Sequence, residues 1–514
     1  MQSKILVRYT DQVDWTRIGD TVNGCQARET VFMKRRDFLK ISLAVGAASV
    51  WPNAGTLAQN GAQKPNILWL MMDDCRPDAL GCYGTSWAKT PNFDHIAANG
   101  VTFESAITQC PICIPSRTSM KTSRYCHELG TMYMGDTPEV TPPYAATARS
   151  YPNLLNQWES AGYKPVNVGK VHALGGDWDH RGDTRFRESD RRHDEGETFD
   201  PVRLTTYGWQ IGGTQDIHVD DTREGVLTER ALDVLKELAD AGTPFFLRVS
   251  YHPPHVPIQV PPPFMVDLDA IDLPFPTQEA LDSKSQFERE QLRVYSGTLD
   301  LSEHDIRVAR STYYGMVNMV DYFVGKIMEQ LRAEGLLENT IIAVNSDHGL
   351  AMGENGVHKK RSFYEEVVKS PLLFSWPGHI PSGRIVREPV EMIDLMPTLL
   401  DLSQMPIPEG HHGRSLVPLM HGDIQTKRNA TFSEIDHSGS MYDPLRINSG
   451  RQVMVRTEDW KLIYFRDPRI DHKDGSLYNL KEDPWEFYNL YNDPQYSHVI
   501  VELESLADDW DQIE

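Results

Sequence analysis

Residues 66–74 read Asn-Ile-Leu-Trp-Leu-Met-Met-Asp-Asp, a short apolar run that ends directly on two aspartates. Such runs, bounded by polar residues, are typical of strands buried on both faces of a parallel sheet. In open α/β sheets, ligands bind in the crevice beyond the carboxyl ends of the strands. The stretch therefore predicts an α/β fold with Asp73 and Asp74 at a ligand-binding edge.

Three further apolar runs end on polar clusters in the same way. They are residues 165–168 before Gly169-Lys170-Val171-His172, 245–251 before His252-Pro253-Pro254-His255, and 341–344 before Asn345-Ser346-Asp347-His348. Helical patterns lie between them, at residues 91–98, 228–241 and 316–331. This alternation predicts a doubly wound α/β domain over residues 64–424.

The character of the chain changes after Gly422. Residues 424–440 are polar and read as a loop, whereas residues 452–456 and 460–466 read as strands. We expect a smaller C-terminal α+β subdomain with an antiparallel sheet over residues 425–514.

The chain is acidic, with 51 Lys and Arg against 73 Asp and Glu among 514 residues and a formal net charge of -22. This balance argues against nucleic acid as a partner, because phosphate backbones need a basic surface. An anionic substrate would need a locally positive pocket in this acidic protein.

The N-terminal region resembles an export signal. Met33-Lys-Arg-Arg-Asp-Phe-Leu-Lys40 is similar to a twin-arginine motif, and a short apolar stretch follows it. We expect a signal peptide at residues 33–58, an upstream extension at 1–32 outside the fold, and no membrane span in the mature protein. This predicts the Tat export machinery as a partner and a periplasmic or secreted location; a basic tail before a surface helix is the alternative.

Asp73, Asp74, Asp347 and His348 all follow predicted strands and offer hard ligand atoms. Three carboxylates suit Ca²⁺ or Mg²⁺ better than a metal that prefers thiolates. The scattered cations include Arg117, Lys170, His172, His255 and Lys360. Together with a metal ion, such groups could hold the negative charge of an anionic substrate.

Cys113 opens the stretch Cys-Ile-Pro-Ser-Arg117, and Pro115 suits the first turn of a helix. Cys110 and Cys113 also form a C-x-x-C pair, which leaves a zinc or redox reading open. If Cys113 is modified, four cysteines remain beyond the signal and allow up to two disulfides.

Six motifs, in order, resemble those of the type I sulfatases of the alkaline-phosphatase superfamily. They are Asp73-Asp74, Cys113-Ile-Pro-Ser-Arg117, Gly169-Lys170-Val171-His172, Pro254-His255-Val256-Pro257, Ser346-Asp347-His348-Gly349 and Gly353-Glu354-Asn355-Gly356 leading to Lys360. The resemblance implies an alkaline-phosphatase-like doubly wound mixed sheet flanked by helices. It also implies that a maturation enzyme oxidises Cys113 to formylglycine (3-oxoalanine), whose hydrate is the nucleophile.

The resemblance assigns roles to these positions. Asp73, Asp74, Cys113, Asp347 and His348 would hold a divalent cation, Ca²⁺ in preference to Mg²⁺. Lys360 and His255 would bind sulfate and assist the leaving oxygen, and His172 would take a proton from the second hydroxyl. Arg117 and Lys170 would hold the hydrate and the sulfate oxygens.

The chain departs from the family pattern at two places. Lys121-Thr122-Ser123-Arg124 stands where the family has an aliphatic residue and then Thr-Gly-Arg, and Lys359 adjoins Lys360, which leaves two candidates for the site lysine.

The pattern at residues 251–255 looks most like iduronate-2-sulfatase-like bacterial sulfatases, so we expect a sulfated saccharide as substrate. A loop rich in arginine, with Arg181, Arg185, Arg187, Arg191 and Arg192, could grip a uronate or further sulfates, or could be merely solvated. The alternatives are a formylglycine-dependent phosphonate monoester or phosphodiester hydrolase, and a non-catalytic binder of sulfated glycans with Cys113 unconverted.

Overall fold

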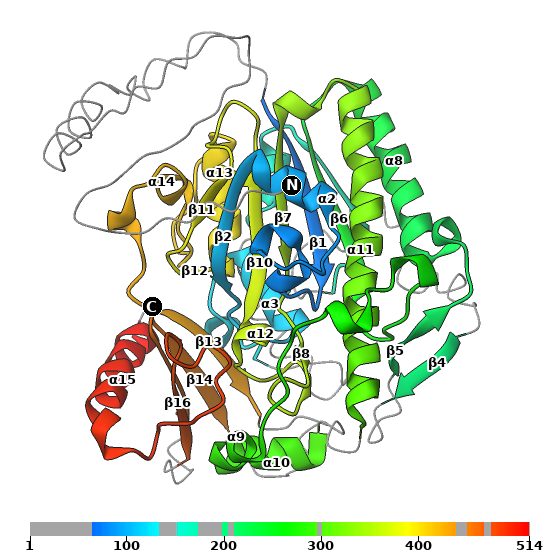
Figure 1. Cartoon of the computed structure of the whole chain (residues 1–514). Helices are drawn as coiled ribbons and strands as arrows, with labels where there is room; N and C mark the ends of the chain where they lie inside the picture. Colours follow the sequence, from blue (N-terminus) through cyan, green and yellow to red (C-terminus); the bar gives the residue numbers. More distant parts are fainter. Residues whose placement is uncertain are drawn as a thin grey trace, which may run out of the picture. The chain divides into compact units, whose positions relative to one another are not determined.

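Strand β1 (Asn66–Asp73) lies inside an eight-stranded sheet of order β11-β2-β10-β7-β1-β6-β3, in which β12 also pairs with β2 (Figure 1). The computed structural model describes residues 64–132, 151, 153–172, 198–203, 210–295, 301–437, 450–466 and 474–512. Residues Lys64–Glu514 form one compact unit.

The four predicted strands lie together in this sheet. Strands β3 (Lys164–Gly169), β6 (Phe245–Pro254), β1 and β7 (Thr340–Ser346) are neighbours and run parallel. Beyond β7, strand β10 (Lys369–Ser375) is antiparallel to both β7 and β2 (Gly100–Ile107). The short strands β11 (Arg384–Val386) and β12 (Val390–Glu391) pair with β2 in parallel. The sheet is therefore mixed, as expected.

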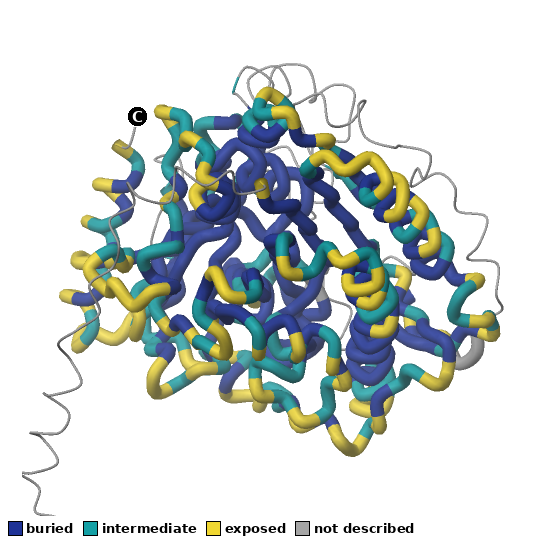
Figure 2. The backbone as a smooth tube through the Cα atoms, turned by 90° about the horizontal axis from the view of Figure 1, so that it is seen from above, coloured by how far each residue is buried: buried dark blue, intermediate teal, exposed yellow. Residues whose placement is uncertain are grey.

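Successive side chains of β1 enter two different cores, because side chains alternate between the faces of a strand. Leu68, Leu70 and Met72 pack in a cluster with residues of α8 (Arg223–Ala241) and α11 (Glu303–Ala333). Trp69 and Met71 pack in a second cluster with residues of α13 (Leu395–Leu402). Helices thus cover both faces of the sheet, and Figure 2 shows the strands buried between them.

Two of the three predicted helices, α8 and α11, extend beyond the apolar patterns that predicted them. Helix α8 begins at Arg223 because the Thr222 hydroxyl accepts a hydrogen bond from the backbone N–H of Gly225. Helix α11 begins after Ser302, which forms a capping box with Asp305. The other α-helices among the described residues are α2 (Pro91–Ala98), α3 (Cys113–Thr122), α4 (Cys126–Leu129), α6 (Asn156–Ser160), α9 (Gln278–Ser283), α10 (Gln286–Tyr295), α12 (Glu365–Val368), α14 (Val417–Met420) and α15 (Ser497–Asp511).

The C-terminal region contains the expected antiparallel sheet. It has four strands, β13 (Thr431–Asp436), β14 (Arg451–Arg456), β15 (Trp460–Phe465) and β16 (Gly475–Asn479), and α15 packs against them. The described residues also form two short antiparallel pairs, β4 (Thr198–Arg203) with β5 (Gln210–Gln215) and β8 (Ala351–Met352) with β9 (His358–Lys359).

The prediction of a polar loop over residues 424–440 was wrong at β13. Ser433 and Glu434 are buried in this strand. The prediction failed because it took buried strands to consist of apolar residues. The carboxylate of Glu434 contacts His127 at 2.9 Å and Arg451 at 2.7 Å, so its burial is compensated.

The fold does not test the predictions for the N-terminal segments or for the domain boundary. The signal peptide and the upstream extension lie outside the described residues, and the domain boundary at residue 424 stays a prediction. Within the described part of the chain, no helix is long and apolar enough to cross a bilayer. Cys75, Cys82, Cys110, Cys113 and Cys126 are all free thiols in the structure.

Candidate active site

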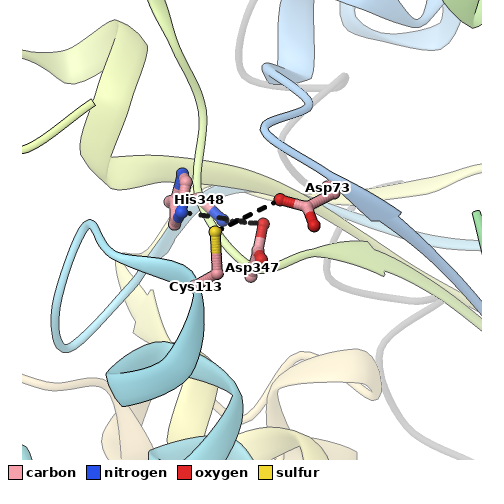
Figure 3. Close-up of side chains that lie close together, drawn as sticks. All are labelled: Asp73, Cys113, Asp347 and His348. Carbon is pink, nitrogen blue, oxygen red and sulfur yellow. Dashed lines mark hydrogen bonds and ion pairs between the residues drawn. The ribbon is translucent and has the colours of Figure 1, made fainter. Parts of the chain in front are cut away.

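Cys113 is the first residue of α3 and is fully buried. Its thiol donates to Oδ1 of Asp73 at 3.4 Å, and its sulfur accepts a hydrogen bond from Nζ of Lys360 at 2.9 Å. Figure 3 shows the sulfur pointing toward Asp73, Asp347 and His348. The helix start thus presents residue 113 to side chains from the ends of β1 and β7.

The next residues of the same stretch fix the helix to these strands. The hydroxyl of Ser116 donates to the backbone carbonyl of Asp347 at 2.7 Å. Arg117 is buried and forms ion pairs with Asp347 at 2.7 Å and with Asp73 at 3.1 Å. Arg117 therefore holds two carboxylates of the site as well as lying near residue 113.

Asp73 is surrounded by positive charge. Its carboxylate pairs with Lys170, which follows β3 and is itself buried. Burial opposes ionisation, but the positive charges of Lys170 and Arg117 hold the pKa of Asp73 well below its ordinary value. Asp73 is thus a carboxylate at neutral pH despite its complete burial.

Asp74, the next residue, differs from Asp73 in its backbone conformation and in the direction of its pKa shift. Its φ of 65° is left-handed, an uncommon conformation for a residue other than glycine that is often found at functional sites. Its Oδ1 is 3.1 Å from Nζ of Lys360 and 3.4 Å from Nδ1 of His348. Burial nevertheless raises the pKa of Asp74 to about 8, so a further cation would be needed to keep it fully charged.

His348 faces the same carboxylates. Its Nδ1 lies 2.9 Å from the backbone carbonyl of Gly349, while Nε2 has no hydrogen-bond partner among the described residues. Burial works against a charged ring, but Asp347 and the other acidic groups raise the pKa of His348 to about 10. A metal ion bound at Nε2 would replace that proton.

Three more histidines, His172, His252 and His255, lie at or just beyond the ends of β3 and β6. His255 places Nδ1 2.8 Å from the carbonyl of Val256, which makes Nδ1 the protonated nitrogen and leaves Nε2 free to accept. Burial, aided by the charge of Lys360, lowers its pKa well below the ordinary value, so the ring is neutral. The ring of His252 is 4.7 Å from that of His255. His172 lies two residues beyond Lys170 with a φ of 40°.

The ligand atoms fit a hard divalent cation. Asp73, Cys113, Asp347 and His348 place one such atom each within 4.8 Å of one another, and Asp73, Asp74, Cys113 and His255 form an overlapping group. Buried carboxylates gathered this closely repel one another unless positive charge lies between them. The residues present therefore fit the predicted metal site, and Lys360 supplies a lysine contact to residue 113.

The sequence did not predict the two buried arginines that support the site, Arg248 and Arg76. Arg248 lies in the middle of β6, and its Nη2 donates to the backbone carbonyl of Lys170, while its guanidinium lies 5.0 Å from the centre of the Trp69 ring. The sequence did offer one signal for Arg248, a charged residue inside the apolar run of residues 245–251. Arg76 pairs with Glu354 and so ties β1 to the loop that leads to Lys360, a contact between distant parts of the chain that spacing does not reveal.

The arginine-rich loop between residues 181 and 192 lies outside the described residues. The contact of this loop with substrate therefore stays a prediction.

Comparison with known proteins agrees with this geometry. The sulfatase family profile matches residues 65–405, and that of the C-terminal region of N-sulphoglucosamine sulphohydrolase matches 353–511. The chain is 26% identical over 478 residues to an arylsulfatase of Clostridium perfringens (86% of this chain, 93% of the relative). It is 25% identical over 557 residues to iduronate 2-sulfatase of Mus musculus (90% and 98%).

The fold also matches a solved structure. The phosphonate monoester hydrolase from Silicibacter pomeroyi superimposes with a TM-score of 0.72 at 24% identity, covering 87% of this chain and 94% of that one.

Proposed function

Because the chain belongs to the sulfatase family, whose members hydrolyse sulfate esters, we propose that it does so through a formylglycine made from Cys113. The observation that carries the proposal is the position of Cys113, buried at a helix start within hydrogen-bonding reach of Lys360 and Asp73. In the mature enzyme an oxygen of the formylglycine hydrate would stand where Sγ stands here. That hydrate supplies a hydroxyl that can displace the alcohol from sulfur.

A divalent cation, Ca²⁺ in preference to Mg²⁺, completes the proposed site. Asp73, Asp74, Asp347, His348 and residue 113 would hold it. It would neutralise charge on the sulfate oxygens. The close approach of ligand atoms from Asp73, Cys113, Asp347 and His348, all within 4.8 Å of one another, supports this assignment.

The cationic side chains have separate tasks in this proposal. Lys360 lies where it can donate to an oxygen on residue 113 and to a sulfate oxygen. Arg117 and Lys170 are already paired with Asp73, so they chiefly hold that carboxylate in place and add positive charge behind the sulfate. His172 would accept the proton whose removal restores the aldehyde at residue 113.

His255 serves the leaving oxygen in this proposal. Its neutral ring presents Nε2, which must gain a proton before it can donate one. The negative charge of a bound sulfate ester would raise the pKa of the ring and favour that protonation.

The substrate class we propose is a sulfated saccharide. Similarity along nearly the whole chain to an iduronate 2-sulfatase supports this choice. The equally similar arylsulfatase makes a small aryl sulfate the competing substrate class. The export signal predicted at residues 33–58 would place the enzyme in the periplasm or outside the cell. Such an enzyme would depend on a formylglycine-generating maturation enzyme and on the Tat machinery.

A turnover screen tests the proposal. Wild-type protein and Cys113→Ala are given matched sulfate and phosphate esters of one alcohol, then a set of defined sulfated saccharides. We expect preference for the sulfate ester and no turnover by the variant. Preference for the phosphate ester would favour the alternative function, a phosphonate monoester or phosphodiester hydrolase. The Silicibacter enzyme with the similar fold is a phosphonate monoester hydrolase. Turnover of neither ester would favour a glycan-binding protein.

A further inference from the structure

Arg223, the first residue of α8, is a buried cation that pairs with none of the described residues. It is only 8% exposed, and no hydrogen bond or ion pair joins its guanidinium to any residue that the structure describes. Burying an uncompensated charge costs several kcal/mol, so buried arginines are almost always paired. A buried cation that no described residue pairs is suited to bind an anionic ligand, even in a protein of net charge -22.

The start of α8 lies beside the strand ends that carry the active site. A Cβ atom on Gly169, the last residue of β3, would come within 2.8 Å of Cδ1 of Leu227. The hydroxyl of Thr228 is 3.0 Å from that of Tyr251. Arg223 lies one turn before Leu227 on the same face of the helix, and helical side chains tilt toward the N-terminus. Its side chain therefore projects past Gly169 and Tyr251, toward the residues that follow them.

Those residues belong to the active site. Lys170 follows Gly169, and His252 follows Tyr251. Burial lowers the pKa of His252 well below its ordinary value, and the positive charges of Lys170 and Arg223 lower it further. The two cations thus act on the same imidazole from different elements. His252 in turn lies 4.7 Å, ring to ring, from His255, so Arg223 belongs to the outer part of the same site.

We propose that Arg223 binds a second oxyanion of the substrate, a carboxylate or a further sulfate, carried on the sugar next to the sulfate ester that is cleaved. A guanidinium suits this task because its fork of N–H donors matches the oxygens of either group. The positive end of the dipole of this nineteen-residue helix favours an anion at the same place. This inference rests on the proposed function and narrows it to substrates with two negative groups.

Three substrates distinguish the two sources of the oxyanion. They are the sulfate monoesters of glucuronate and of glucose, esterified at the same hydroxyl, and a glucose disulfate that carries that ester and one more. For Arg223→Gln we expect the ratio of kcat/KM for a doubly anionic sugar over glucose monosulfate to fall about 10- to 100-fold. Arg223→Lys should recover part of the ratio. Loss for glucuronate alone identifies a carboxylate site, and loss for the disulfate alone identifies a second sulfate site.

A control on the same helix separates recognition from folding. Arg230 pairs loosely with Asp233 at 3.8 Å and Glu237 at 3.7 Å near the surface, and Arg230→Gln should leave the substrate ratio unchanged. Equal loss of kcat/KM for all three sugars in Arg223→Gln would mean that Arg223 only supports the fold, and would overturn the inference.

Binding separates this inference from the proposed function. Titration of the three sugars into Cys113→Ala and Cys113→Ala/Arg223→Gln measures affinity without turnover. We expect the first protein to prefer a doubly anionic sugar and the second to lose that preference. If the preference and its loss occur although the wild type cleaves no sulfate ester, the proposed chemistry is wrong and the Arg223 site stands. If both proteins bind the three sugars with the same relative affinities, the Arg223 site is wrong whatever the chemistry.

Discussion

Nζ of Lys360 lies 2.9 Å from Sγ of Cys113 and 3.1 Å from Oδ1 of Asp74. This lysine therefore joins the residue proposed as the nucleophile precursor to a carboxylate of the proposed metal site. Burial opposes its charge, but Asp74 and Cys113 raise the pKa of Lys360 above its ordinary value, so it stays a cation throughout the physiological pH range.

Lys360→Ala should lower kcat at least about 100-fold, because it removes a fixed positive charge from the site of charge development. Its neighbour provides the matched control, and Lys359→Ala should keep most of the activity. Steady-state kinetics with one sulfate ester compares the two variants. A larger loss in Lys359→Ala than in Lys360→Ala would contradict the assignment.

Removal of divalent cations should abolish turnover and lower the Tm. Asp73, Asp74 and Asp347 are buried close together, and without a bound cation their mutual repulsion is less compensated. Dialysis against a chelator, followed by thermal unfolding and an activity assay with and without added Ca²⁺, measures both effects. Full activity in protein shown by elemental analysis to be metal-free would rule out the proposed ion.

The stability of the protein should depend on pH through His358. Burial lowers the pKa of this side chain from 6.5 to about 4, and its Nε2 has no hydrogen-bond partner among the described residues. Between these values the unfolded chain binds a proton that the folded chain does not. The contribution of His358 to stability is therefore complete above pH 6.5 and is lost as the pH falls toward 4.

His358→Gln removes this proton linkage. Between pH 7 and pH 5, the wild type should lose about 2 kcal/mol more of its unfolding free energy than the variant. Urea titrations at both pH values give the four free energies. The same loss in both proteins would show that His358 is not the titrating group.

Ser123 ends helix α3 with a left-handed φ of 56°, where the sulfatase pattern has glycine. Its hydroxyl donates to the backbone carbonyl of Ile393 at 2.7 Å and accepts from the backbone N–H of Gly413 at 3.2 Å. Ser123→Ala keeps the strained conformation and loses both bonds, so it should destabilise the protein by about 1–3 kcal/mol. Ser123→Gly also loses the bonds but relieves the strain by about 1 kcal/mol, and should cost less. Denaturant unfolding ranks the two; a more stable Ala variant would show that the strain is negligible.

The sequence predicted the central parallel strands well, because each is a continuous apolar run that ends on polar residues. It also predicted which polar clusters meet, since the carboxyl ends of parallel strands share one edge of the sheet. Strand β13 was missed because its buried Glu434 is compensated by residues distant in the sequence. Arg223 was missed because nothing in its local pattern shows that it is buried and lacks a partner within the described part of the chain.

The measurement that tests the central claim most directly is the mass of the peptide that contains residue 113, from protein purified from the cells that naturally make it. We predict that residue 113 is recovered as formylglycine or its hydrate in enzyme that cleaves sulfate esters. Recovery of unmodified cysteine at position 113 in protein with full sulfatase activity would contradict the account.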